Sequence, residues 1–340
     1  MKAALIGTPF SGKSSVFQAL TGLVPGKKEE SIGTIKVPDE RVDRLTDIYL
    51  PKKKTYAEFV LSDFNVPVSK DTVISPKIKN MIQKTDLIIL VLRNFESVLT
   101  VEGVDPVSEY LKVKEDLIIN DFLVVERRIE REKKEKKDLP EKKVLQKLYS
   151  ILENGEFPQR DFISEDEAEL VSNYKFLSLK EMIVLVNQPE GQNQVPEKLK
   201  RMLHEDKVDS FCVSAPFEVE LAELEPEEQT EFLKDYGLTE SAKTRFIKSA
   251  YHSLGLISFL TTGPDEVRAW PIKKGTSAVV AAGKIHSDIQ RGFIRAETIH
   301  YDDFVKYGSE SECKKAGAYR LEGKEYSVRD GDIVNFRFNV

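Results

Sequence analysis

The chain has 340 residues, of which 40% are apolar and 32% are charged, and its formal net charge is -6. This length and composition predict a globular protein of two or three domains with ample core. The mild negative charge excludes a general electrostatic attraction to nucleic acid, so any RNA contact must be a local basic patch, and we expect no DNA binding.

Composition also predicts the environment of the protein. Cys212 and Cys313 lie far apart and have no metal-ligand spacing, which indicates a reducing compartment and no structural zinc. The longest apolar runs, such as residues 87–92, are too short to span a bilayer, and Met1 leads directly into an apolar run without a signal peptide. We therefore expect a cytoplasmic protein that has no membrane partner.

The most informative motif follows the first predicted strand. Residues 7–14 read Gly-Thr-Pro-Phe-Ser-Gly-Lys-Ser, which is the phosphate-binding pattern Gly-x-x-x-x-Gly-Lys-Ser. An apolar run, residues 3–6, precedes it, and a helical pattern, residues 16–20, follows it. This strand-loop-helix context disfavours a glycine-rich turn that binds nothing, so we predict a site for a nucleoside triphosphate.

Each residue type in this loop has a chemical role. Gly7 and Gly12 allow backbone turns in which successive N–H groups face one anion. Lys13 places an ammonium group on the β- and γ-phosphates, and the Ser14 hydroxyl is the expected Mg²⁺ ligand. The loop residues that we expect to bind the nucleotide are Gly7, Pro9, Phe10, Ser11, Gly12, Lys13, Ser14 and Ser15.

Short unbroken apolar runs recur along the chain and predict the main sheet. They occupy residues 3–6, 59–61, 87–92, 182–186 and 211–213. Strands that do not alternate are typical of a parallel sheet that helices cover on both faces. We predict an α/β fold, a P-loop NTPase with a doubly wound, mostly parallel sheet, whose nucleotide-binding domain comprises residues 1–108 and 178–255.

Residues 109–177 interrupt this domain with a helical pattern. Apolar residues recur at three- and four-residue steps up to Ile129, a charged stretch follows at residues 127–137, and Leu139-Pro140 precedes a second amphipathic pattern. We predict an α-helical coiled-coil hairpin. Its charged tip is either a solvated helix end or a docking surface for a macromolecular partner.

The last segment, residues 256–340, has the alternation and turn residues of a small, β-rich α+β domain. Its predicted strands include residues 257–260, 267–270, 294–299, 326–328 and 333–338. Basic residues lie near Trp270 and Phe293, in a pattern that suits either a phosphate-binding face with stacking rings or a solvated sheet face. These basic residues are Arg268, Lys273, Lys274, Lys284, Arg291 and Arg295.

A second part of the nucleotide site is expected after residues 182–186, where the sequence reads Asn187-Gln188-Pro189-Glu190. GTPases carry Asn-Lys-x-Asp here, and the Asp carboxylate accepts two hydrogen bonds from guanine. Glu190 moves the carboxylate by about 1.5 Å, which weakens guanine selectivity. Asn187 is then expected to contact the adenine edge or a neighbouring loop. The alternative is that residues 187–190 are an ordinary strand-to-loop turn. Ser214 and Ala215 form the expected second base-contacting loop.

Several of these motifs together resemble the YchF/Obg-like ATPase family. They are the phosphate loop, Val37-Pro38-Asp39-Glu40-Arg41, the variant Asn187-x-x-Glu190, and the last 85 residues, including Glu266-Val267-Arg268-Ala269-Trp270 and Arg291-Gly292-Phe293-Ile294-Arg295. The resemblance spans the chain. It implies a nucleotide-binding domain with a helical insertion and a C-terminal TGS domain, a preference for ATP over GTP, and association with ribosomes or RNA.

The chain departs from the family pattern at two places that bear on catalysis. The family's Asp-x-x-Gly is Asp63-Phe64-Asn65-Val66 here, and the glycine-rich stretch after it is replaced by residues 67–72. Asp63 can still hold a Mg²⁺-bound water, but Val66 brings its backbone less close to a γ-phosphate than glycine would. The switch threonine is also missing, and Ser31 and Thr34 are weak substitutes.

We therefore expect an ATP-binding protein, with GTP as the second ligand and Mg²⁺ as the metal, that hydrolyses nucleotide slowly or not at all. It would engage the ribosome or RNA through the C-terminal domain and the hairpin. Two alternatives stay open: a scaffold that ATP only stabilises, and a competent ATPase that an unidentified residue completes. The expected metal residues are Ser14 and Asp63.

Overall fold

The computed structural model describes residues 1–26, 29–64, 73–97, 103–135, 140–158 and 162–339. They form two compact units. The first unit comprises residues 1–35 and 60–250, and the second comprises residues 36–59 and 251–340.

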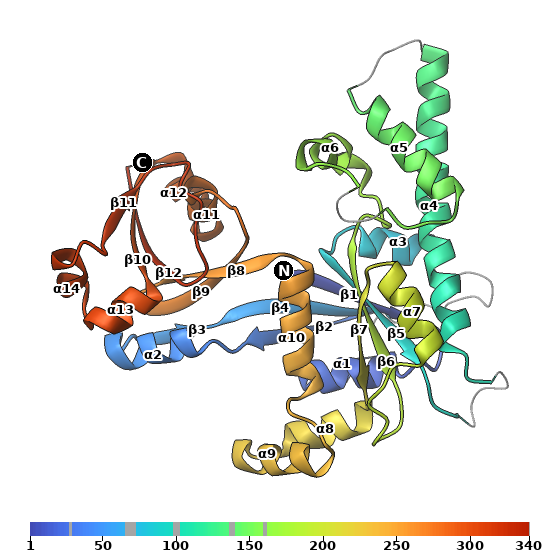
Figure 1. Cartoon of the computed structure of the whole chain (residues 1–340), viewed down its shortest axis with the longest axis horizontal. Coiled ribbons are helices and arrows are strands. Elements are labelled where there is room, and N and C mark those ends of the chain that lie inside the picture. The colour runs from blue at the N-terminus through green and yellow to red at the C-terminus, as the bar shows by residue number, and fades with distance from the viewer. Residues whose placement is uncertain (27–28, 65–72, 98–102, 136–139, 159–161, 340) are drawn as a thin grey trace. The chain divides into compact units, whose positions relative to one another are not determined.

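The first unit is built on a six-stranded sheet with the order β2-β4-β1-β5-β6-β7 (Figure 1). Its strands are β1 (Lys2–Gly7), β2 (Glu30–Val37), β4 (Ala57–Phe64), β5 (Leu87–Arg93), β6 (Glu181–Asn187) and β7 (Asp209–Val213). The pairs β1–β4, β1–β5, β5–β6 and β6–β7 are parallel. Every residue of β5 is buried, as expected for a strand with helices on both faces.

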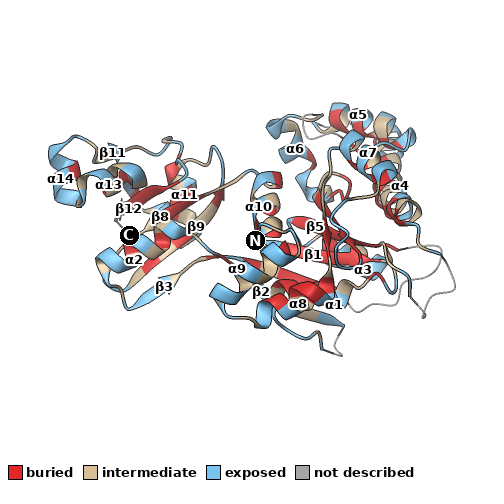
Figure 2. Ribbon diagram, turned by 60° about the horizontal axis from the view of Figure 1, so that its bottom comes forward, coloured by how far each residue is buried: buried red, intermediate tan, exposed pale blue. Residues whose placement is uncertain are grey.

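Helices connect the strands of this sheet and cover it. They are α1 (Lys13–Thr21), α3 (Pro76–Ile82), α7 (Glu197–Glu205), α8 (Ala215–Glu223), α9 (Pro226–Asp235) and α10 (Ala242–Ser253). Figure 2 shows that burial is concentrated in central strands such as β1 and β5, whereas the helices also carry exposed faces. The predicted α/β fold with a mostly parallel sheet is confirmed.

Between β5 and β6 the chain forms the long helix α4 (Pro106–Glu135) and the shorter helix α5 (Lys142–Glu153), which pack against each other. The short helices α6 (Glu165–Val171) and η1 (Ser172–Tyr174) follow. Residues 136–139, which include part of the predicted charged tip, lie outside the described residues.

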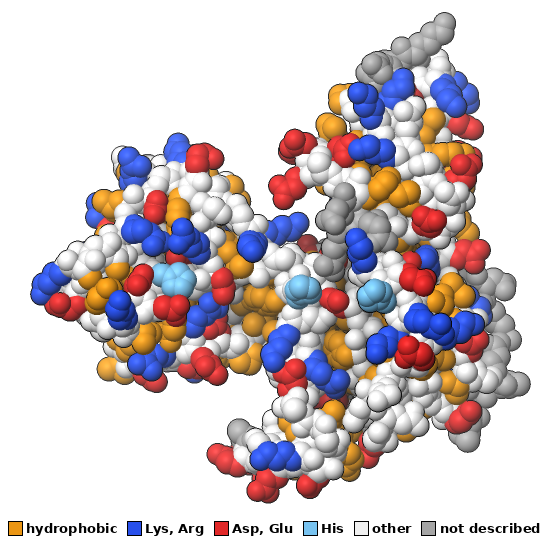
Figure 3. All heavy atoms as spheres, viewed as in Figure 1, with side chains coloured by type: hydrophobic (Ala, Val, Ile, Leu, Met, Phe, Trp, Pro, Cys, Tyr) orange, Lys and Arg blue, Asp and Glu red, His pale blue; other side chains and the backbone are white. Residues whose placement is uncertain are grey.

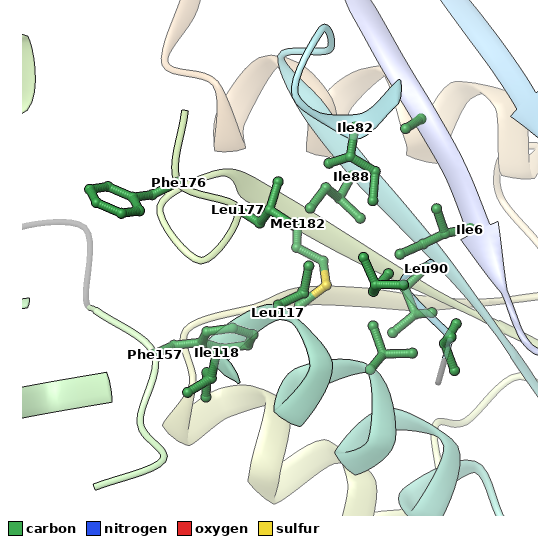
Figure 4. Packing of buried hydrophobic residues seen from close by; sticks show 14 of the residues in the cluster. Ile6, Ile82, Ile88, Leu90, Leu117, Ile118, Phe157, Phe176, Leu177 and Met182 are labelled. Atoms are coloured by element: carbon green, nitrogen blue, oxygen red, sulfur yellow. The ribbon is translucent and has the colours of Figure 1, made fainter. Parts of the chain in front are cut away.

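The hairpin helices share one core with the sheet. Leu117 and Ile118 of α4 lie near Leu90 of β5 and Met182 of β6 (Figure 4). The buried face of α4 also includes Tyr110 and Val113, at the three- and four-residue steps of an amphipathic helix. The first half of α4 is therefore anchored by burial against the sheet.

The second unit has its own six-stranded sheet, with the order β11-β10-β12-β8-β9-β3. The strands are β3 (Lys53–Thr55), β8 (Leu256–Thr261), β9 (Glu266–Lys273), β10 (Phe293–His300), β11 (Arg320–Glu322) and β12 (Asp332–Phe338). Its helices are α2 (Glu40–Tyr49), α11 (Ala278–Ile285), α12 (Ser287–Arg291), α13 (Tyr301–Tyr307) and α14 (Glu310–Lys315). β3 pairs in parallel with β9, so an early segment of the chain completes the C-terminal sheet.

Two expectations for this unit were wrong. Residues 326–328 form only an isolated bridge, between Ser327 and Ser277, and no strand. Phe293 is only 6% exposed and packs near Phe336 in the core, so it has no surface for stacking on a base.

The family-like motif at residues 37–41 has a structural role within the second unit. Asp39 caps α2 by accepting a hydrogen bond from the Arg41 N–H at 3.0 Å. The Arg41 guanidinium pairs with Asp39 and, at 3.0 Å, with Asp330 in the turn before β12. The other Asp330 oxygen accepts a hydrogen bond from the N–H of Ser258 at 2.8 Å. The motif therefore fixes α2 to the C-terminal sheet.

Within the described ranges, no helix is both long enough and apolar enough to cross a membrane.

Candidate nucleotide-binding site

The phosphate loop joins β1 to α1 in a conformation that only glycine permits at two positions. Gly12 caps α1 with φ at 80°, in the left-handed region, and a Cβ there would lie 2.1 Å from Asn187 Nδ2. A Cβ on Gly7 would lie 2.6 Å from the carbonyl oxygen of Val91. Phe10 is also left-handed, with φ at 64°. The loop is therefore curved as an anion-binding loop requires.

This loop encloses a cavity of about 540 Å³ at the carboxyl end of β1. Residues 5–14 line it together with Phe64, Val73 and Ile78. The volume is typical of small-molecule sites, and the N-terminus of α1 opens onto it. The buried hydroxyl of Ser11 has no hydrogen-bond partner among the described residues, which leaves a polar atom beside the cavity for a ligand.

Two side chains that line this cavity, Lys13 and Ser14, meet the buried carboxylate of Asp63 beside it. The Lys13 ammonium pairs with one carboxylate oxygen of Asp63 and donates to the carbonyl of Phe64 at 3.0 Å. The Ser14 hydroxyl lies 3.4 Å from the other carboxylate oxygen of Asp63. The sheet produces this arrangement, because β1 and β4 are parallel neighbours with Leu5 opposite Asp63. A change at the end of β4 would therefore act directly on the phosphate loop.

The donor set fits Mg²⁺. A hydroxyl and a carboxylate are hard oxygen ligands, and Mg²⁺ in nucleotide sites takes few protein ligands in addition to phosphate oxygens and water. No group of three or more His, Cys, Asp or Glu side chains suited to a metal occurs among the described residues. A Mg²⁺ ion at Ser14 and Asp63 would therefore depend on the nucleotide for its other ligands.

Asn187 connects the phosphate loop to the loop after β7. Its side chain is buried at the end of β6, donates from Nδ2 to the carbonyl of Ser11 at 3.0 Å, and accepts at Oδ1 from the N–H of Ala215 at 3.3 Å. Of the two expected contacts for Asn187, the structure supplies the one to neighbouring loops. Both ends of the amide are therefore used to position these loops.

The next residue, Gln188, also faces inwards. It is 2% exposed, accepts a hydrogen bond from Asn94 Nδ2 at 3.0 Å, and donates to the carbonyl of Gln192. Glu190, in contrast, is exposed and lines a small pocket with Ser214 and Tyr236. No sequence motif indicates that Gln188 and Asn94 form the pair that holds this loop. Their positions at the ends of the neighbouring strands β6 and β5 were the available signal.

A second feature that the motifs did not indicate is the link between the phosphate loop and α4. Glu109, in the first turn of α4, accepts a hydrogen bond from the N–H of Arg93 at 3.2 Å and lies beside the Thr8 hydroxyl. Burial raises the pKa of Glu109, and the contacts with Arg93 and Thr8 partly oppose this rise. Two helical turns further along α4, the Asp116 carboxylate accepts hydrogen bonds from the N–H groups of Val73 and Ile74 at 2.5 and 2.9 Å.

Known proteins are similar to this chain over its full length. A family model described as YchF-GTPase_C, a protein of unknown function (DUF933), matches residues 256–339. Proteins named Ribosome-binding ATPase YchF are similar along the whole chain. The one from Bacillus subtilis is 36% identical, with 100% of both chains covered, and the one from Escherichia coli O157:H7 is 34% identical, with 100% of this chain and 99% of the relative covered.

Solved structures agree with this relationship. The YchF GTPase of Schizosaccharomyces pombe has a TM-score of 0.85 and 30% identity, covering 99% of this chain and 97% of its own. A GTP binding protein from Pyrococcus horikoshii shares the fold, with a TM-score of 0.59 and 15% identity over the full length of both chains. With a phosphate loop of this geometry and relatives that match it from end to end, the chain belongs to the YchF family.

Proposed function

We propose that this protein binds ATP with Mg²⁺ at the phosphate loop, hydrolyses it slowly, and engages the ribosome or its RNA. The observation that carries the proposal is the meeting of Lys13 and Ser14 with Asp63 beside the cavity of a glycine-shaped loop. When bound, Mg²⁺ would supply charge neutralisation at the β- and γ-phosphates. The name shared by the bacterial relatives, Ribosome-binding ATPase YchF, supports the assignment of ATP as the nucleotide and of the ribosome as the partner.

A preference for ATP over GTP follows from the loop after β6. Guanine recognition needs a carboxylate held at a fixed distance from the base, and Glu190 is a longer side chain on an exposed loop. The amides of Asn187 and Gln188 are already bonded to the protein. A guanine base would therefore lack its usual fixed hydrogen-bond acceptor, whereas an adenine base does not use this acceptor.

Slow hydrolysis is supported by the departures in sequence. Val66 and residues 67–72 lie outside the described residues, so this part of the proposal rests on the amino acids alone. Ser31 and Thr34, the two substitutes for a switch threonine, are both in β2, and the Ser31 hydroxyl accepts a hydrogen bond from the N–H of Gly26 at 3.0 Å. Phosphoryl transfer depends on positioned groups, so missing contacts reduce the rate directly.

Contact with RNA is assigned to the basic residues of the second unit, some of which appear on the face shown in Figure 3. Arg268 stacks over Trp270 with its guanidinium carbon 3.9 Å from the ring centroid, and Arg291 pairs with Asp288. Four others are exposed, and none of them forms an ion pair with any residue that the structure describes, which leaves them available for phosphates. These four are Lys273, Lys274, Lys284 and Arg295.

The nucleotide site is tested by isothermal titration with ATP and Mg²⁺. Lys13→Ala should abolish ATP binding because the charge on the phosphates is lost, and the protein should stay folded because losing the pair with buried Asp63 costs only about 1–3 kcal/mol. The matched control is Lys243→Ala, at an exposed position of α10, which should bind ATP like the wild type. A folded Lys13→Ala protein with wild-type affinity would overturn the assignment.

The ribosome part is tested by co-sedimentation with purified ribosomes at two salt concentrations. Replacing these four basic residues of the second unit by glutamate should lower the affinity for the ribosome by a factor of about ten or more. Each lost phosphate contact removes a contribution from counterion release. The same replacement of four exposed lysines of the first unit is the control. These lysines are Lys198, Lys200, Lys234 and Lys243. Equal effects of the two sets would contradict a specific basic face.

A further inference from the structure

The α4–α5 hairpin carries an open groove with a volume of about 570 Å³. Its lining includes a row of α4 side chains and, from the end of α5 onwards, Leu152, Glu153 and Gly155. In α4 the residues Leu111, Glu115, Ile118 and Phe122 recur at three- and four-residue steps, so they lie along one face of the helix. The row is about 16 Å long, which is three helical turns.

Part of this groove is apolar surface that the described fold leaves open. Leu111 is 45% exposed and Ile119 is 47% exposed, although Ile118 between them belongs to the buried core. Phe122 packs against Tyr149 of α5 with ring centroids 5.1 Å apart and forms part of the groove wall. An apolar groove of this size with a polar rim is typical of a protein-interaction site.

The charge on the rim is acidic. Glu115 and Glu153 line the groove, and neither forms an ion pair with any described residue. The basic residue in the lining, Lys114, is bonded to Asp206 at 2.7 Å and lies over the ring of Phe157. Partial desolvation and then the nearby carboxylates of Glu153 and Glu126 raise the pKa of Tyr149, as expected where the potential is negative.

We infer that this groove binds an amphipathic helix of a protein partner, with apolar side chains on one face and Lys or Arg beside them. The apolar face would cover Leu111 and Ile119, and the basic side chains would neutralise Glu115 and Glu153. RNA does not fit, because its phosphates would meet the carboxylates of Glu115 and Glu153, which have no cationic partner among the described residues. A second copy of the groove does not fit either, because it would bring the same carboxylates.

This inference goes beyond the proposed function, because it assigns a protein segment as the partner of the hairpin, which the proposed function does not use. The basic residues of the second unit would contact RNA, whereas the hairpin groove would contact protein. The two surfaces have opposite charge, so their binding can be measured and disrupted separately.

The test uses the full chain and two fluorescein-labelled synthetic peptides in fluorescence anisotropy. The first peptide is a helix of about four turns with leucine at every third or fourth position and lysine or alanine elsewhere. The second has glutamate in place of each lysine. The basic peptide should bind at least about tenfold more tightly than the acidic one at low salt, and this ratio should fall as salt screens the charges.

Variants assign the binding to the groove. Ile119→Glu should lower the affinity for the basic peptide by a factor of about ten or more. The double variant Glu115→Lys with Glu153→Lys should bind the acidic peptide more tightly than the basic one. Matched controls are Leu170→Glu, at a similarly exposed apolar residue of α6, and Glu223→Lys, at an exposed position at the end of α8; both should bind like the wild type.

The outcomes separate this inference from the proposed function. Equal binding of the two peptides, or full binding by a folded Ile119→Glu protein, would overturn the groove assignment. Direct binding of a fluorescein-labelled short single-stranded RNA that is weakened by Ile119→Glu would also overturn it, in favour of a nucleic-acid surface. If the wild-type protein does not sediment with ribosomes or does not bind ATP, but still binds the basic peptide through the groove, the proposed function is overturned. The assignment of the groove as a peptide-binding site is then supported.

Discussion

Asp63 and Asn187 shape the phosphate loop from two different strands of the first sheet. Asp63 is the residue before the last one of β4 and holds Lys13 and Ser14, whereas Asn187 ends β6 and holds the carbonyl of Ser11. Both side chains are buried, and a buried polar group that loses its partner costs about 1–3 kcal/mol. The folded chain therefore favours the conformation of the loop in which these bonds are made.

The base preference can be tested at two neighbouring residues with different roles. Glu190→Asp, at an exposed position, should shift the ratio of ATP to GTP affinity towards GTP without affecting stability, because it shortens the carboxylate by one methylene. Gln188→Lys should instead lower the free energy of unfolding by about 1–3 kcal/mol, because it removes the bonds to Asn94 and Gln192 in a buried position.

Isothermal titration with each nucleotide and urea denaturation measure these two effects. The wild type should bind ATP at least as tightly as GTP. A wild-type preference for GTP of tenfold or more, which is about 1.4 kcal/mol, would contradict our interpretation of Glu190.

At the scale of the elements, α4 is held to the first sheet by carboxylates as well as by apolar packing. Asp121 accepts hydrogen bonds from the N–H and the hydroxyl of Ser178, just before β6, at 2.6 and 2.7 Å. Burial nevertheless raises the pKa of Asp121 above the 3.8 of an exposed aspartate. The ionised form is therefore tolerated in the fold but is less favourable there than in water.

This raised pKa predicts the sign of a pH effect. Between 3.8 and the higher folded-state pKa, the folded protein binds more protons at Asp121 than the unfolded chain does, so this contribution to stability is present at low pH and is lost as the pH rises. The difference in free energy of unfolding between the wild type and Asp121→Asn should decrease over this interval. Urea denaturation at several pH values measures it, and Asp166→Asn, at an exposed position, is the control.

The link between α2 and the C-terminal sheet allows a second prediction at this scale. Arg41→Met should lower the free energy of unfolding by about 1–2 kcal/mol, because Arg41 pairs with both Asp39 and Asp330 and is largely buried. Lys52→Met is the matched control, since the pair Lys52–Asp265 is about 80% exposed and should contribute little. Equal denaturation curves for the two variants would contradict the role assigned to Arg41.

For the whole molecule, the main prediction is the rate of turnover. Single-turnover hydrolysis of labelled ATP should be as slow as the roughly 10⁻⁴ s⁻¹ of an unassisted small GTPase, or slower. Val66→Gly should restore part of the rate, because glycine can approach the γ-phosphate more closely. Lys13→Ala is the control for contaminating ATPases, and the measurement is repeated with ribosomes.

A wild-type rate near 1 s⁻¹ that disappears in Lys13→Ala would show that another residue completes the site. A low rate that ribosomes do not raise, with tight ATP binding, would favour the scaffold alternative, in which ATP is a structural ligand. A low rate that ribosomes raise would favour an enzyme activated by its partner.

The features of this protein that depend on local pattern can be predicted from its amino acids alone. The phosphate loop is recognisable because its glycines, Lys13 and Ser14 have fixed spacing between a strand and a helix. The parallel strands are recognisable because burial on both faces requires unbroken apolar runs. These patterns predicted the α/β fold class, and the family resemblance carried by separate motifs along the chain is also confirmed.

The pairing of distant segments, in contrast, is visible only in the folded chain. No pattern at Lys53–Thr55 indicates that β3 pairs with β9, and no pattern shows that Asn187 and Gln188 direct their amides into the protein. Likewise, the alternation around Phe293 suited an exposed ring as well as a buried one. The physical reason is that a strand edge, an amide and an aromatic ring each have several favourable partners, and the partner is chosen by long-range packing that local sequence does not encode.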